Sequence, residues 1–127
     1  MAGLRDVFVL KRIYDDPADD DGARVLVDRL WPRGVSKEKA HLDLWLKEVA
    51  PSSPLRTEFA HMQERFTDFR RQYEAELDNN PAVQTLLELA RSNPRVTLLY
   101  AARDPEVNHA VVLREFLLGQ AGAQDPR

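Results

Sequence analysis

The pattern of apolar and polar positions along the chain predicts several short strands. Residues 7–10 form a β-branched and aromatic run that is typical of a strand. Residues 24–28 are a compact apolar run between polar ends, and residues 96–100 are almost continuously apolar. Runs of this kind favour strands that are covered on both faces. Residues 42–46 alternate between apolar and polar side chains and predict a further short strand.

Helical spacing dominates the second half of the chain. Between residues 64 and 77 the apolar side chains recur at intervals of three and four positions, as on one face of a helix. A second helix is expected to begin at Pro81 and to end at Asn93, and a last helix is expected over residues 106–118. Residues 119–127 are predicted to form a flexible polar tail.

Strands near both ends of the chain with helices between them predict an α/β fold. We expect a single layered domain over residues 1–127, with a small, largely parallel sheet flanked by helices. Residues 15–22 hold five aspartates, a proline and a glycine, which predicts a solvated acidic loop. This loop is at the short limit, roughly 10 residues, for a crossover between parallel strands. The first two strands could therefore pair antiparallel instead.

Composition narrows the function mainly by exclusion. The chain has 127 residues, a net charge of −3 and no cysteine. Without cysteine the chain can form no disulfide, no thiolate nucleophile and no Cys-ligated metal site. Its three histidines are scattered and form no metal-binding motif, so we expect neither a metal nor a cofactor. No apolar run approaches the ~18–20 residues of a membrane span, and the N-terminus lacks a signal sequence, which predicts a cytoplasmic protein.

Unusual chemistry follows the buried strand at residues 24–28. The turn that comes next brings together Asp28, Arg29, Trp31 and Arg33. Arginine offers planar donors to phosphate or carboxylate, and tryptophan offers a ring for stacking. An equally good interpretation is structural: Asp28 pairs with one of the arginines and Trp31 fills the core.

A second candidate segment joins the strand at residues 96–100 to the last helix. It carries Arg103, Asn108 and His109, and a strand–loop–helix junction directs backbone N–H groups and the positive end of a helix dipole toward a bound ligand. The structural alternative is a His109 ring that packs or hydrogen-bonds locally. His61 could supply a partner for His109, although the pattern does not place its segment.

These residues lie in strings that resemble the YeaO-like family of small bacterial proteins. The most specific string is Asp-Arg-Leu-Trp-Pro-Arg-Gly at residues 28–34, and further matching stretches cover nearly the whole chain up to residues 108–110. The resemblance implies no reaction, because no activity is established for the family. Longer relatives carry a Cys-His-Arg triplet where this chain has Asn108, His109 and Ala110. Chemistry that needs the thiol is therefore not implied here, whereas an anion-binding or acid–base role for His109 stays open.

The leading hypothesis is a site for a small anion, a phosphate or a carboxylate, with or without catalysis. In parallel sheets ligands bind beyond the carboxyl ends of the strands, where both segments are expected to lie. Arg29 and Arg33 would bind the anion, His109 would exchange a proton, Asp28 would orient His109 or an arginine, and Trp31 would form an apolar wall.

The alternative is a non-catalytic binding module in which the basic residues between 29 and 39 hold a protein partner or nucleic acid. The acidic balance of the chain disfavours nucleic acid. A concave pocket would favour the anion site, and a flat basic surface would favour the binding module.

Overall fold

The strands form one sheet in which every neighbouring pair is parallel, which confirms the α/β prediction. The computed structural model of the chain describes residues 7–58 and 62–124. The sheet has four strands in the order β1-β4-β2-β3. Their bounds are Phe8–Arg12 for β1, Ala23–Leu26 for β2, Leu44–Trp45 for β3 and Val96–Tyr100 for β4.

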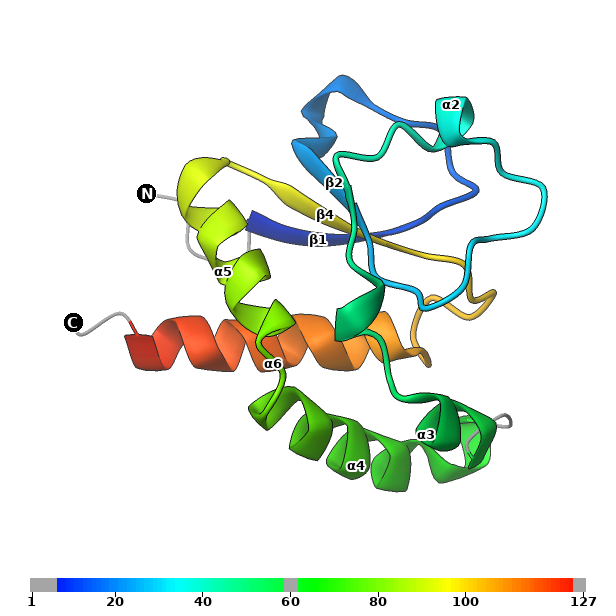
Figure 1. The fold of residues 1–127 in the computed structure, drawn as a ribbon, viewed down its shortest axis with the longest axis vertical. Coiled ribbons are helices and arrows are strands. Elements are labelled where there is room, and N and C mark those ends of the chain that lie inside the picture. Colours follow the sequence, from blue (N-terminus) through cyan, green and yellow to red (C-terminus); the bar gives the residue numbers. More distant parts are fainter. Residues whose placement is uncertain (1–6, 59–61, 125–127) are drawn as a thin grey trace.

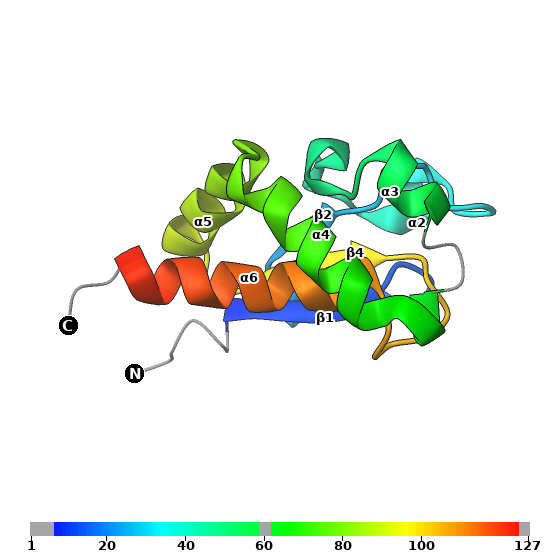
Figure 2. The same ribbon diagram turned by 90° about the horizontal axis from the view of Figure 1, so that it is seen from below.

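The helices cover both faces of this sheet. They are α2 (Lys37–Ala40), α3 (Ser53–Glu58), α4 (Phe66–Asp78), α5 (Ala82–Ser92) and α6 (His109–Gln124), with 3₁₀ turns at Asp19–Asp21, Lys47–Val49 and Met62–Arg65. Figure 1 shows α4, α5 and α6 on one side of the sheet and α2 on the other. In the perpendicular view of Figure 2, α6 lies along β1.

The last helix differs from its predicted bounds at both ends. It begins at His109 rather than at residue 106, because the Asn108 side chain accepts a hydrogen bond from the Val111 N–H at 3.0 Å and caps the helix there. It also continues past Leu118 to Gln124, beyond its predicted end, while the flexibility predicted for residues 119–127 stays a prediction. Alanine and glutamine at four of these six positions favour the helix, because adding residues to a helix that is already formed needs no new nucleus, whereas Gly119 and Gly122 oppose it.

The first two strands do not pair with each other, so the antiparallel alternative is wrong. Both pair with β4, and Leu98 of β4 lies opposite Leu10 of β1 and Val25 of β2. The chain leaves β1 with the Ile13 N–H bonded to the Tyr100 carbonyl at 2.8 Å, and then crosses β4 to start β2 on its other side.

The acidic loop is solvated only in part. Asp21 is 6% exposed, which corrects the expectation for the last aspartate of the loop. Its carboxylate bonds Lys11 Nζ at 3.2 Å, the backbone N–H of Ala18 at 2.9 Å and the Arg24 guanidinium. Burial by itself would raise the pKa of Asp21, but these hydrogen bonds outweigh it and hold the pKa below its ordinary value of 3.8. Arg24 also bonds the Ala40 carbonyl at 2.8 Å, so the pair joins this loop to α2.

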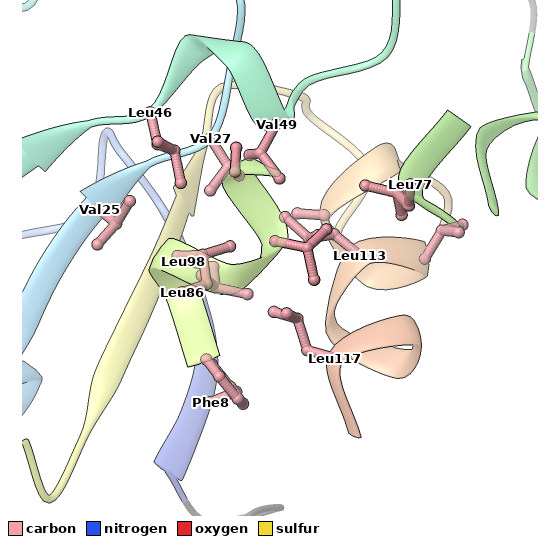
Figure 3. Close-up of a cluster of buried hydrophobic side chains, with 14 of the residues drawn as sticks. Phe8, Val25, Val27, Leu46, Val49, Leu77, Leu86, Leu98, Leu113 and Leu117 are labelled. Carbon is pink, nitrogen blue, oxygen red and sulfur yellow. The ribbon is translucent and has the colours of Figure 1, made fainter. Parts of the chain in front are cut away.

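Apolar side chains pack on both faces of the central strands, as their continuous apolar runs predict. The larger cluster lies between the sheet and α4, α5 and α6, and Figure 3 shows Val25 and Leu98 of the strands facing Leu86 of α5 and Leu113 of α6. A smaller cluster on the other face contains Leu26 and Leu99 with Ile13 and Ala40. The two faces alternate along each strand because successive side chains point in opposite directions.

Candidate functional site

A cavity of about 360 Å³ lies where the parallel strands end, and the segment that follows each strand contributes to its wall. All strands of a parallel sheet finish at the same edge, which brings loops distant in sequence together. The wall residues are Tyr14 after β1, Asp28, Arg29, Leu30, Trp31, Pro32 and Arg33 after β2, Ala50, Pro51 and Arg56 after β3, Phe69 of α4, and Ala101, Ala102 and His109 after β4.

Asp28 and His109 are in contact in this wall. Nε2 of His109 lies 3.0 Å from the Val27 carbonyl oxygen and 3.1 Å from Oδ1 of Asp28. Both neighbours are hydrogen-bond acceptors, so the neutral imidazole carries its proton on Nε2 and its lone pair on Nδ1. Oδ2 of Asp28 accepts a hydrogen bond from the Ala101 N–H at 2.9 Å. Oδ1 is buried and has no hydrogen-bond partner in the described part of the chain.

A buried tyrosine supports the histidine from the core side. The rings of Tyr73 and His109 meet edge to face with 6.3 Å between their centroids. The Tyr73 hydroxyl donates to the Val49 carbonyl at 2.7 Å. Burial raises the pKa of this hydroxyl well above its ordinary value of 10, so the group stays a neutral donor.

The arginines of the turn are not paired with Asp28, so the ion pair that the structural alternative expected is wrong. Arg29 donates instead to the carbonyls of Pro51 and Ala50, at 3.1 Å each. Arg33 is exposed, and its side chain forms no ion pair with the residues that the structure describes. Its backbone carbonyl accepts a hydrogen bond from the Tyr14 hydroxyl at 3.0 Å.

Trp31 both fills the core and lines the cavity. It is half-buried and packs against the smaller apolar cluster. Its indole N–H donates to the Val35 carbonyl at 2.6 Å, and its ring meets Trp45 edge to face at 5.3 Å. These contacts fix the orientation of the ring beside the cavity.

Two of the residues singled out in the sequence do not reach this wall. Arg103 is exposed in the loop before α6 and lies outside the wall. Asn108 is 2% exposed; its amide oxygen accepts from the Val111 N–H, and its amide nitrogen donates to the Asp104 carbonyl at 2.7 Å. The residue that occupies the cysteine position of the longer relatives is therefore a helix cap.

Arg56 and Tyr14 belong to the wall although the sequence pattern did not point to them. Arg56 lies on α3 and is exposed, without an ion pair to other described residues. Its position depends on how a short helix packs beside the sheet, and local sequence carries no signal for that. Tyr14 could have been found, because it follows the first strand just as Asp28 follows the second. His61 lies outside the described residues.

Positive charge is concentrated at this cavity. Its wall holds three arginines and a single carboxylate, Asp28, in a chain whose net charge is −3. Another cavity, of about 410 Å³ near the turn between α4 and α5, has Asp78 as the charged residue of its wall. The described residues include no group of three or more potential metal ligands, and no helix among them is long and apolar enough to cross a membrane.

Comparison with known proteins identifies the family. A family model described as "Inactive DUF488-N3 subclade" matches residues 7–127. The uncharacterized protein YeaO of Escherichia coli K12 is 44% identical over 108 residues, which cover 84% of this chain and 93% of YeaO. The uncharacterized protein Rv3073c of Mycobacterium tuberculosis H37Rv is 41% identical over 109 residues, 86% of this chain and 92% of Rv3073c. No solved structure matches the chain significantly. The chain therefore belongs to the YeaO-like family, in the branch described as the inactive DUF488-N3 subclade.

Proposed function

We propose that this domain binds a small anionic molecule, a carboxylate or a phosphate, in the cavity at the carboxyl ends of the strands. The observation that carries the proposal is the pair Arg33 and Arg56. Both line the cavity and are exposed, and neither has an ion pair within the described chain. A guanidinium presents a planar fork of donors that matches carboxylate and phosphate oxygens.

A third arginine supports the proposal because it is already held in place. Arg29 uses Nε and Nη2 to bind the carbonyls of Pro51 and Ala50. Its Nη1 has no hydrogen-bond partner among the described residues. A side chain fixed before binding loses less conformational entropy when the ligand arrives, which favours affinity.

We assign binding without covalent catalysis to the site. The thiol position of longer relatives is Asn108, which caps α6, and the family model is described as inactive. Asp28 holds His109 with the Nε2 proton directed at protein acceptors. In this proposal the histidine shapes the wall.

The size and shape of the site support a small molecule over a polymer. A volume of about 360 Å³ is near the lower end of the roughly 300–1,000 Å³ range of small-molecule pockets. A module for nucleic acid was expected to present a flat basic surface, whereas these arginines line a cavity of an acidic chain.

Thermal unfolding of the protein with added anions, at constant ionic strength, tests the proposal. Inorganic phosphate and cyclohexylacetate should each be tried against the neutral cyclohexylethanol. Ligand that binds the native state raises the melting temperature with concentration, so at least one anion should stabilise the protein and the neutral compound should not.

The stabilisation should be lost in Arg33→Gln and Arg56→Gln, while both variants melt like the parent without ligand. Arg103→Gln is the matched control, since this arginine is equally exposed but lies outside the wall. Equal stabilisation of all three variants, or no effect of any anion, would contradict the proposal.

A further inference from the structure

Exposed apolar side chains gather at the same cavity. The large hydrophobic residues most exposed in the described chain are Leu30 at 60%, Tyr14 at 45% and Trp45 at 37%. Leu30 and Tyr14 line the cavity, and Trp45 contacts the wall residue Trp31. Single exposed apolar residues are ordinary on protein surfaces, whereas several of them around one cavity point to a binding site.

Two aromatic rings of the cavity wall, Tyr14 and Trp31, are held by hydrogen bonds to the backbone. The Tyr14 hydroxyl donates to the Arg33 carbonyl, and the Arg12 guanidinium lies 5.1 Å from the centroid of the Tyr14 ring. The indole N–H of Trp31 donates to the Val35 carbonyl. Because the polar atoms of both rings are used by the protein, what the rings offer a ligand is apolar surface.

The rest of the described wall has little capacity to bind a polar ligand body. It contains no Ser, Thr, Asn or Gln side chain, and most of its other members are apolar, such as Phe69, Pro32 and Pro51. A sugar or a nucleobase would find few side-chain partners in this wall besides the arginines, Asp28 and His109, and each buried donor or acceptor left unpaired is costly. A ligand with an apolar body and one anionic group needs polar partners only for that group, and the arginines can supply them.

We infer that the ligand is an aromatic acid, that is, a flat apolar ring that carries one anionic group. The ring packs against Trp31 and Tyr14, and the acid group pairs with Arg33 and Arg56. This inference rests on the proposed anion-binding function and adds the class of ligand. Favourable ring–ring contacts should tighten binding about 2- to 12-fold over a saturated ring of the same charge.

A comparison of phenylacetate with cyclohexylacetate tests the inference, because the two differ mainly in the flatness and π-system of the ring. Calorimetric titration gives both dissociation constants. The chain has two tryptophans, of which Trp31 lines the cavity and Trp45 packs against Trp31, so intrinsic fluorescence reports binding independently. Phenylacetate should bind about 2- to 12-fold more tightly and should perturb the fluorescence.

Variants assign this preference to the rings. Trp31→Leu should bring the two dissociation constants together while both acids still bind. Because Trp31 also packs on the core, that variant could fail to fold; Tyr14→Leu, at a more exposed position, then carries the same expectation.

Phenyl phosphate identifies the acid group of the ligand. Tighter binding than phenylacetate supports an aromatic phosphate, and weaker binding supports an aromatic carboxylate.

The outcomes separate the two proposals. Equal affinity for phenylacetate and cyclohexylacetate overturns the aromatic ligand and leaves anion binding standing. Binding of neutral phenylacetamide as tightly as phenylacetate, or no binding of any acid, overturns the proposed function itself.

Discussion

Oδ1 of Asp28 lies 3.1 Å from Nε2 of His109, although one residue follows β2 and the other begins α6 after β4. The other oxygen of the same carboxylate holds the Ala101 N–H at 2.9 Å. A single side chain therefore ties the turn after β2 to the whole β4–α6 junction. Since both segments line the cavity, this contact sets its shape.

The contact predicts the tautomer of His109. At a pH where the ring is neutral, its proton should be on Nε2, because this nitrogen faces two acceptors, the Val27 carbonyl and Asp28. Nitrogen-15 chemical shifts of the imidazole, from a long-range proton–nitrogen correlation spectrum, distinguish the two tautomers. A predominant Nδ1–H form would contradict the geometry.

Two substitutions of Asp28 measure how much its bond to the Ala101 N–H stabilises the fold. Asp28→Ala leaves the Val27 carbonyl to hold the same tautomer, but it removes the acceptor of the Ala101 N–H. The free energy of unfolding should fall by about 1–3 kcal/mol, because the partly buried Ala101 N–H loses its acceptor. Asp28→Asn should lose less, since its amide oxygen can still accept that bond.

The sequence predicted those parts of the fold and site that depend on local pattern. The apolar runs at β2 and β4 are covered on both faces, as such runs predict. Asp28 and His109 were chosen because each lies beyond a strand end, and a parallel sheet brings those ends to one edge. Their functional roles stay predictions.

Features that depend on the pairing of distant segments could not be predicted. Composition makes residues 15–22 a solvated loop, yet Asp21 is buried because Lys11 and Arg24 arrive from two strands to neutralise it. The place of β4 between β1 and β2 has no local signal either. Arg56 joins the site only because α3 packs beside it.

The Asp21 cluster predicts a pH-dependent effect on stability. A carboxyl group with a lowered pKa in the folded state stabilises the fold above its ordinary pKa, and this contribution is lost as the pH falls through the folded value. Asp21→Asn should therefore cost most near pH 7, where Arg24, 5% exposed, loses its charged partner. Breaking a buried pair in this way typically costs roughly 3–5 kcal/mol.

Urea unfolding at neutral pH and at about pH 3 measures this difference, because the lower value lies below the ordinary pKa of an aspartate. The deficit of Asp21→Asn relative to the parent should shrink at the acidic value. Asp20→Asn is the control, since that side chain is 81% exposed and should matter little at either pH. An undiminished deficit in acid would show that the charge of Asp21 is not what stabilises the fold.

Two glycines in left-handed backbone regions provide a last test, of how β2 begins. Gly22 has φ 67° and ψ −136°, and a Cβ atom there would lie 2.1 Å from the Arg95 carbonyl oxygen. That oxygen accepts the Ala23 N–H at 2.9 Å, so relief of the clash would pull apart the start of β2 beside β4.

Gly34 has φ 75°, but a Cβ atom there meets nothing within 4 Å. Gly34→Ala should therefore cost only the backbone term, about 1–2 kcal/mol. Gly22→Ala should cost about 1–3 kcal/mol for backbone strain and a further 1–3 kcal/mol for the steric conflict. Urea unfolding of the two variants compares them directly, and equal losses would mean that the Arg95 carbonyl does not confine Gly22.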